Sequence, residues 1–179
     1  NKEELKNFDS IIFAGSLCSY FRKNKKDFLP KSYLIDDHNI TMKIKDNPIF
    51  KNKDLKIGLS WKSVVSVYGK LKSLNLADFK PLIKKNRQFI NLQYGEVKEE
   101  IKKTENKNFN IYSFEEINLF NDLDELMSIL KNLDIFITVS NSTAHIAAAM
   151  GVRTLLICPK ISSTYFYWSN EKNKTPWYK

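Results

Sequence analysis

The sequence predicts an α/β protein built on a Rossmann-like, doubly wound and mostly parallel sheet with strand order 3-2-1-4-5. From about residue 56 onward, short apolar runs of strand length alternate with segments of helical periodicity. Strands joined through helices run parallel, because each helix returns the chain to the end of the sheet where the previous strand began. Residues 133–159 show the pattern most clearly, with an apolar run, a polar turn, a small-residue helix and a second apolar run.

The apolar runs predict the strands. KIGLSW and QFINLQ are short and mainly apolar, and the run that begins at Asp134 is rich in β-branched residues. Pro159 follows the last run and ends it, because proline cannot donate to a strand ladder. The predicted strands span residues 56–61, 88–93, 109–112, 134–140 and 154–158.

The segments between these strands predict helices. The first has Asp78 near its start, and the second is highly charged, which predicts an exposed helix. The third carries leucine and methionine at helical spacing on one face, and the fourth is kept thin by alanines. The predicted helices span residues 76–85, 96–103, 122–131 and 142–150.

Length and composition limit the domain count. The 179 residues, 42% of them hydrophobic, suffice for one domain, or for one domain and an incomplete neighbour. Residues 1–55 lack a strand–helix–strand pattern, and we expect them to be the tail of a preceding domain plus a linker, with residues 56–179 forming the Rossmann-like domain. The chain does not begin with Met, so we expect a piece of a longer protein.

The location expected from the sequence is the cytoplasm, with the inner membrane surface as an alternative. The charged start has no signal-peptide pattern, and no apolar run has the length of a transmembrane segment. The two cysteines, Cys18 and Cys158, lie in distant segments, so a disulfide is not expected.

The formal net charge of +9 has two interpretations. It attracts anionic partners, or it reflects a lysine- and asparagine-rich composition typical of AT-rich coding. The second is favoured because the lysines are scattered and do not form a stripe with aromatic residues. Nucleic acid is therefore not an expected partner.

The turn after the fourth strand predicts an anion site. Its polar residues can cap the next helix, and the free N–H groups and dipole of a helix start favour phosphate. His145 lies in the first helical turn, where the dipole favours a neutral imidazole that can donate to phosphate. Lys62, at the end of the first strand, faces the same crevice. The candidate binding residues are Ser140, Asn141, Ser142, Thr143, Ala144 and His145. The alternatives are plain capping residues, a core histidine and one more surface lysine.

Two further candidates lie at the ends of the second and third strands. Gln93 is a candidate contact for a base or ribose, and Glu116, with Glu115 and Asp122, for ribose hydroxyls. The alternative is a solvated loop and a helix cap. The aromatic residues 166–168 are expected to form a lid or to cover the sheet edge, and Trp177 and Tyr178 to pack at the cleft rim. No metal site is expected, since the chain has two histidines and neither a CxxC nor a DxD motif.

Spaced motifs resemble a known family. They are IGLSWK at 57–62, LQYGE at 92–96, LDIFITVSNSTAHIAAAMG at 133–151 and TPWYK at 175–179. This series resembles the C-terminal half of heptosyltransferase-type glycosyltransferases, most of all bacterial proteins with tetratricopeptide repeats before the glycosyltransferase domain. Asn141 stands where the family commonly has Asp, and Ser63 where it has Gly. Measured against the family pattern, the chain is expected to be truncated before the final strand and helix.

The resemblance implies one half of a GT-B fold. The chain would hold the nucleotide-sugar donor, while an N-terminal domain of the same polypeptide would supply the acceptor site. The implied reaction is metal-independent transfer of a hexosyl or heptosyl group to a glycan, lipid or protein, with no cofactor. Lys62 and His145 would be the catalytic residues, and the catalytic base would lie outside this chain.

Two other functions stay open. One is a non-catalytic module that keeps nucleotide binding or assembly, which the Asn141 substitution favours. The other is a nucleotide-sugar epimerase of the same architecture. Alone, the chain is expected to bind donor weakly and to transfer no sugar.

Overall fold

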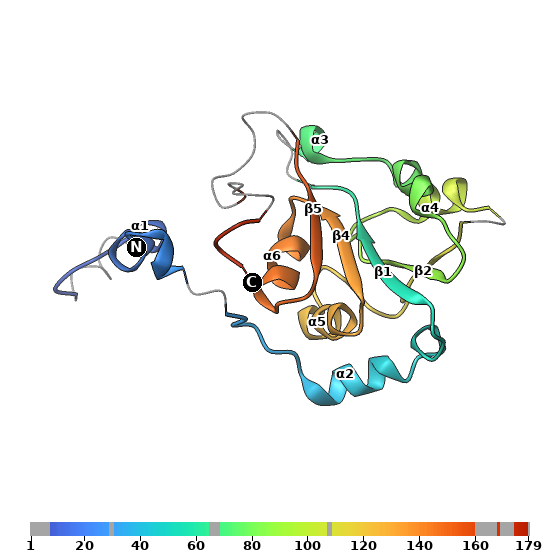
Figure 1. Ribbon diagram of the computed structural model, residues 1–179, viewed down its shortest axis with the longest axis horizontal. Coiled ribbons are helices and arrows are strands. Elements are labelled where there is room, and N and C mark those ends of the chain that lie inside the picture. The colour runs from blue at the N-terminus through green and yellow to red at the C-terminus, as the bar shows by residue number, and fades with distance from the viewer. Residues whose placement is uncertain are drawn as a thin grey trace.

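The protein is described by a computed structural model at residues 8–28, 31–64, 69–106, 109–159, 168 and 174–178. Its centre is a five-stranded sheet in which every pair of neighbouring strands is parallel, in the order β3-β2-β1-β4-β5 (Figure 1). The predicted fold class and strand order are therefore confirmed. The strands are β1 (Leu55–Ser60), β2 (Arg87–Asn91), β3 (Ile111–Tyr112), β4 (Ile135–Val139) and β5 (Thr154–Ile157).

The helices between the strands differ from the prediction in two respects: residues 69–72 form a short helix that was not predicted, and the helix after it has a different form. The predicted helix over 76–85 is a 3₁₀ helix, because Pro81 lies inside it and has no N–H for an α-helical bond. The α-helices are α1 (Ala14–Phe21), α2 (His38–Lys45), α3 (Gly69–Lys72), α4 (Lys98–Thr104), α5 (Leu123–Lys131) and α6 (Ser142–Ala149). The 3₁₀ helices are η2 (Lys25–Asp27), η3 (Pro48–Phe50) and η4 (Leu76–Leu82).

Two apolar layers hold the sheet, one on each face. On one face, Ile57 and Leu59 of β1 pack with Phe79 of η4 and Ile101 of α4. Because Ile101 is buried there, α4 is not the wholly exposed helix that its charges predict. On the other face, the strands pack against α2, α5 and α6 through a cluster that includes Ile44, Ile90, Leu126, Phe136 and Ala147.

Residues that the sequence placed in a linker pack on this second face. Helix α2 runs beside α5 (Figure 1), and the Thr41 hydroxyl lies 3.1 Å from the Ser128 hydroxyl. The Asn132 amide donates to the Thr41 carbonyl at 3.1 Å. Asp37 caps α2 by accepting from the N–H groups of its first turn. Residues 37–50 are thus in contact with the same core as the sheet.

Helix α1 stands apart from the sheet (Figure 1), and none of its residues is buried. The chain beyond it contacts the C-terminal segment, where the Arg22 guanidinium lies 5.0 Å from the centre of the Trp177 ring. No helix among the described residues has both the length and the apolar character of a membrane span.

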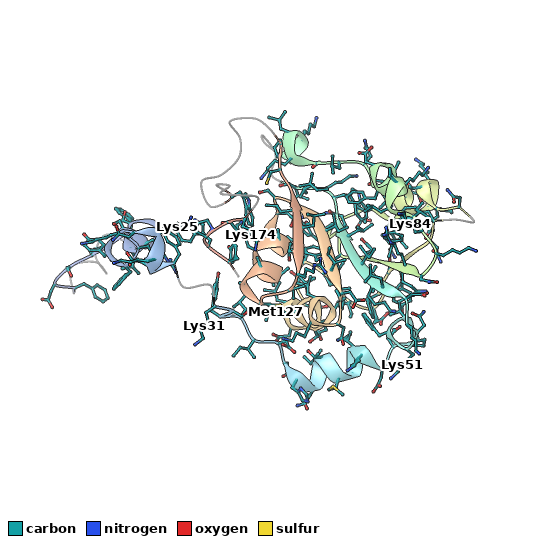
Figure 2. All side chains as sticks on the ribbon, in the orientation of Figure 1. Lys25, Lys31, Lys51, Lys84, Met127 and Lys174 are labelled. Atoms are coloured by element: carbon teal, nitrogen blue, oxygen red, sulfur yellow. The ribbon has the colours of Figure 1, made fainter. Side chains whose placement is uncertain are left out.

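The lysines labelled in Figure 2 lie at separate places around the periphery. Lys25 and Lys174 lie near the C-terminal segment, whereas Lys51 and Lys84 lie on the far side of the sheet.

Candidate functional site

Asn141 joins the ends of the two central strands. The register pairs Ser60 of β1 with Thr138 of β4, so the chain leaves both strands at the same edge of the sheet. There the Asn141 Nδ2 donates to the Ser60 hydroxyl at 2.8 Å and to the Lys62 carbonyl at 3.3 Å. Its Oδ1 accepts from the Ala144 N–H at 3.0 Å and so caps α6. One buried side chain therefore fixes the helix start against β1.

The start of α6 keeps two backbone donors. Of the three N–H groups predicted to bind phosphate, that of Ala144 is used by the Asn141 cap. Within the described part of the chain, the N–H groups of Ser142 and Thr143 have no acceptor, as expected for the first residues of a helix. Ser142 is exposed and Thr143 is buried.

Ser140 has a structural partner. Its hydroxyl is buried and accepts from the Trp168 indole N–H at 2.9 Å. Ser140, which the sequence analysis placed at the anion site, thus holds the indole of Trp168 in place.

His145 is half-buried among aromatic side chains. Its Nδ1 lies 2.6 Å from the Tyr178 hydroxyl, and its ring is stacked on Trp168 with centroids 4.4 Å apart. Burial lowers the pKa of His145, and the positive charge of Lys72 lowers it further. Both effects favour a neutral imidazole at pH 7, through burial and Lys72 and not through the helix dipole that the sequence analysis invoked.

Lys72 is a cation that the sequence analysis missed. It lies on α3, between β1 and η4, and its side chain is buried. Its positive charge contributes to the lowered pKa of His145. No local signal marks it among the many lysines of the chain.

Lys62 is already paired. Its Nζ lies 2.5 Å from Glu100 Oε2 on α4. The same carboxylate accepts from the Trp61 indole at 3.0 Å and from the Leu76 N–H at 3.0 Å. Burial raises the pKa of Glu100, but these three donors outweigh it, so that its pKa is lowered and it is an anion. The backbone of Lys62 is where the sequence predicted, while its ammonium is turned toward α4.

Gln93 is a hub for the end of β1. Its Oε1 accepts from the Ser60 hydroxyl at 3.0 Å and from the N–H groups of Trp61 and Lys62 at 2.9 and 2.7 Å. Its Nε2 donates to the Tyr94 carbonyl at 2.9 Å. The side chain is 2% exposed. The structure therefore gives Gln93 an internal role at the end of β1, while the predicted contact with a base or ribose stays a prediction.

A cavity of about 770 Å³ opens beyond the ends of β2 and β3. Its walls come from the chain after β1, β2 and β3 and from α4, and include Val64, Asn91, Tyr94, Lys98, Ser113 and Glu116. Glu116 is exposed at this cavity, while the neighbouring Glu115 pairs with Lys98. The predicted crevice lies between β1 and β4, so the cavity is displaced from it toward β2 and β3.

The remaining predictions concern the C-terminal aromatic residues, a metal site and the cysteines. Phe166 and Tyr167 of the predicted lid lie outside the described residues, whereas Trp168 stacks on His145. Tyr178, predicted to pack at the rim, contacts the imidazole directly. Across the described ranges, no group of three or more His, Cys, Asp or Glu side chains has the arrangement of a metal site. Cys18 and Cys158 are free thiols.

The hydrogen bonds of Asn141 predict the effect of replacing it by aspartate. Asn141→Asp is expected to lower the free energy of unfolding by about 1–2 kcal/mol, because the carboxylate has no donor for the Ser60 hydroxyl or the Lys62 carbonyl. The favourable charge at the start of α6 offsets only about 0.3–1 kcal/mol of this loss. Urea denaturation measures it. The control is Asn39→Asp in the exposed first turn of α2, which is expected to be neutral or stabilising; an equal response of the two variants would contradict the network.

Comparisons with known proteins support the fold. No protein-family model matches the chain. The chain is 30% identical over 126 residues to Protein FlbA of Caulobacter vibrioides, an alignment that covers 63% of this chain and 20% of FlbA. It superposes on the E. coli ADP-heptose LPS heptosyltransferase II with a TM-score of 0.53 and 15% identity, over 76% of this chain and 43% of that one. The chain thus has a heptosyltransferase-like fold and spans a fifth of FlbA and less than half of the heptosyltransferase.

Proposed function

We propose that this chain is the donor-binding domain of a glycosyltransferase that takes a sugar from a nucleotide-sugar. The observation that carries the proposal is the start of α6, which Asn141 holds between the ends of β1 and β4 with two backbone donors and His145 beside them. The same edge of an α/β sheet is where ligands of such folds bind. The likeness to a heptosyltransferase fold agrees with this assignment.

Each part of the site has a role in this proposal. The diphosphate would accept hydrogen bonds from the N–H groups of Ser142 and Thr143 and from His145. The nucleoside would extend toward the cavity at β2 and β3, where Glu116 could accept from ribose hydroxyls. Lys62, once released from Glu100, would offset the charge that builds on the leaving diphosphate.

The rest of the reaction is assigned to a second domain. We infer a metal-independent transfer of a hexosyl or heptosyl group in the cytoplasm or at the inner membrane surface. A second domain of the same polypeptide would bind the glycan, lipid or protein acceptor and supply the base. The helix start and the lysine provide the positive charge that such a transfer needs at the diphosphate.

Calorimetry with a nucleoside diphosphate and the matching nucleoside tests the proposal. The diphosphate is expected to bind at least about tenfold more tightly, because hydrogen bonds to a charged group contribute about 1.5–3 kcal/mol. Repeating the titration with several bases identifies the preferred nucleotide. Equal affinities for diphosphate and nucleoside would exclude the phosphate role of α6.

The Lys62–Glu100 pair predicts a gain of affinity. Glu100→Gln is expected to release the ammonium and to tighten diphosphate binding about two- to fivefold, on the scale of a partly exposed ion pair. Nucleoside binding should not change, since it lacks the phosphates. Glu99→Gln, on the exposed side of the same helix, is the control and is expected to have no effect. An unchanged diphosphate affinity in Glu100→Gln would show that Lys62 does not reach the ligand.

The same pair favours a second candidate, a donor domain that has lost catalysis and only binds a nucleotide. In that case Glu100 permanently holds the cation that turnover needs. A polypeptide that carries both domains, binds the diphosphate and transfers no sugar would support this candidate.

A further inference from the structure

The imidazole of His145 is enclosed by residues from the end of the chain. Trp168 lies parallel to it, with ring centroids 4.4 Å apart and planes at 24°. Tyr178 lies on another side, with centroids 5.9 Å apart and planes at 60°. The rings of Trp168 and Tyr178 also contact each other, with their centroids 5.8 Å apart. A histidine held in this way has little freedom to rotate.

Trp168 is fixed to the body of the protein, and the segment that carries Tyr178 is fixed to the N-terminal segment. The Trp168 indole donates to the buried Ser140 hydroxyl at 2.9 Å. Trp177, next to Tyr178, packs edge-on against Phe28 with centroids 4.9 Å apart. The guanidinium of Arg22 lies over the same indole, so the segment is held from two sides. Tyr178 therefore presents its hydroxyl to His145 from a defined position.

The hydroxyl favours one of the two neutral tautomers. A neutral imidazole has one N–H donor and one acceptor nitrogen, and a phenol hydroxyl can either donate or accept. The 2.6 Å contact between the Tyr178 hydroxyl and Nδ1 fits both directions. A phenol is a stronger donor than acceptor, so the favoured arrangement has the hydroxyl donating to Nδ1, which requires the imidazole proton on Nε2. In that tautomer Nε2 is a donor, as a phosphate oxygen requires, whereas the other tautomer would turn a lone pair toward the anion.

We propose that Tyr178 is a positioning residue that holds His145 in the neutral tautomer with its proton on Nε2. The imidazole is thereby kept as a hydrogen-bond donor for the diphosphate. The hydrogen bond from His145 Nε2 to a phosphate rests on the proposed function. The assignment of the tautomer does not depend on that function. Tyr178 acts through His145, and its own contact with the ligand is not needed.

NMR of ¹⁵N-histidine-labelled protein reads the tautomer directly. The chain has only two histidines, and His38 is exposed at the start of α2, so it serves as an internal reference. In the wild-type protein at pH 7, His145 is expected to show a protonated Nε2 and an acceptor Nδ1. A proton on Nδ1 would overturn the proposal, and this measurement needs no variant that has to fold.

Tyr178→Phe removes only the hydroxyl. It is expected to shift His145 toward a mixture of tautomers and to weaken nucleoside diphosphate binding about two- to tenfold, on the scale of one hydrogen bond. The control is Tyr33→Phe. Tyr33 is exposed and contacts the end of α6 only through its backbone N–H in the described hydrogen bonds, so this substitution is expected to change neither the tautomer nor the affinity. An unchanged tautomer in Tyr178→Phe would overturn the proposal.

The two readouts separate this inference from the proposed function. If the wild-type protein binds no diphosphate and Tyr178→Phe still shifts the tautomer, the positioning by Tyr178 is supported and the phosphate role is overturned. If the diphosphate binds and the tautomer does not respond, the positioning role is overturned and the proposed function stands.

Discussion

Replacing Gln93 by Leu is expected to lower the free energy of unfolding by about 3–5 kcal/mol. The side chain is buried, and its Oε1 accepts from three donors at the end of β1, two of which are backbone N–H groups. Leucine leaves these donors without a partner, and each buried donor left unsatisfied costs about 1–3 kcal/mol. A loss of this size is a large fraction of the stability of an ordinary domain.

Gln88, in β2, offers a matched control on the strand that precedes Gln93. Its Oε1 is buried and has no hydrogen-bond partner among the described residues. Gln88→Leu therefore removes a polar atom that is unsatisfied in the folded state, and it is expected to be neutral or stabilising. Urea denaturation of both variants gives the comparison. Similar losses for the two glutamines, or a loss below about 1 kcal/mol for Gln93→Leu, would contradict the hub role.

Replacing His145 by Ala is expected to lower kcat/KM for sugar transfer about 10²- to 10³-fold, as measured for the removal of one preorganised donor. The assay uses a polypeptide that joins this chain to its proposed acceptor domain. The imidazole is held neutral by burial and by Lys72, and oriented by Tyr178 and Trp168, so alanine removes a donor that is already in place.

His38→Ala is the control for this experiment. His38 is the other histidine of the chain and is exposed at the start of α2. Its removal should leave the rate unchanged. Full activity of His145→Ala would show that the chemistry takes place elsewhere in the protein.

The sheet, and the meeting of the carboxyl ends of β1 and β4, could be predicted from local sequence patterns. Apolar runs separated by helices are enough to predict parallel strands, and the reversal of strand order between β1 and β4 brings Ser60 and Asn141 together. The same reasoning placed the backbone of Lys62 correctly. These features depend on periodicity and connectivity, which a single sequence carries.

The partners of the site residues did not follow from the sequence. Glu100 pairs with Lys62, and Tyr178 bonds to His145, through contacts between segments far apart in the chain. A charged helix and a terminal aromatic pair give no local sign of such contacts. The 3₁₀ form of η4 was foreseeable, since Pro81 excludes an α-helical bond.

The central claim is that the start of α6 binds the diphosphate. Backbone amide NMR during titration with a nucleoside diphosphate tests it most directly. The amide signals of Ser142 and Thr143 are expected to shift most, while those in the first turn of α2, which Asp37 caps, should stay in place. If the amides of Ser142 and Thr143 do not move while the nucleotide binds elsewhere, or if the first turn of α2 responds equally, the assignment of the site is wrong.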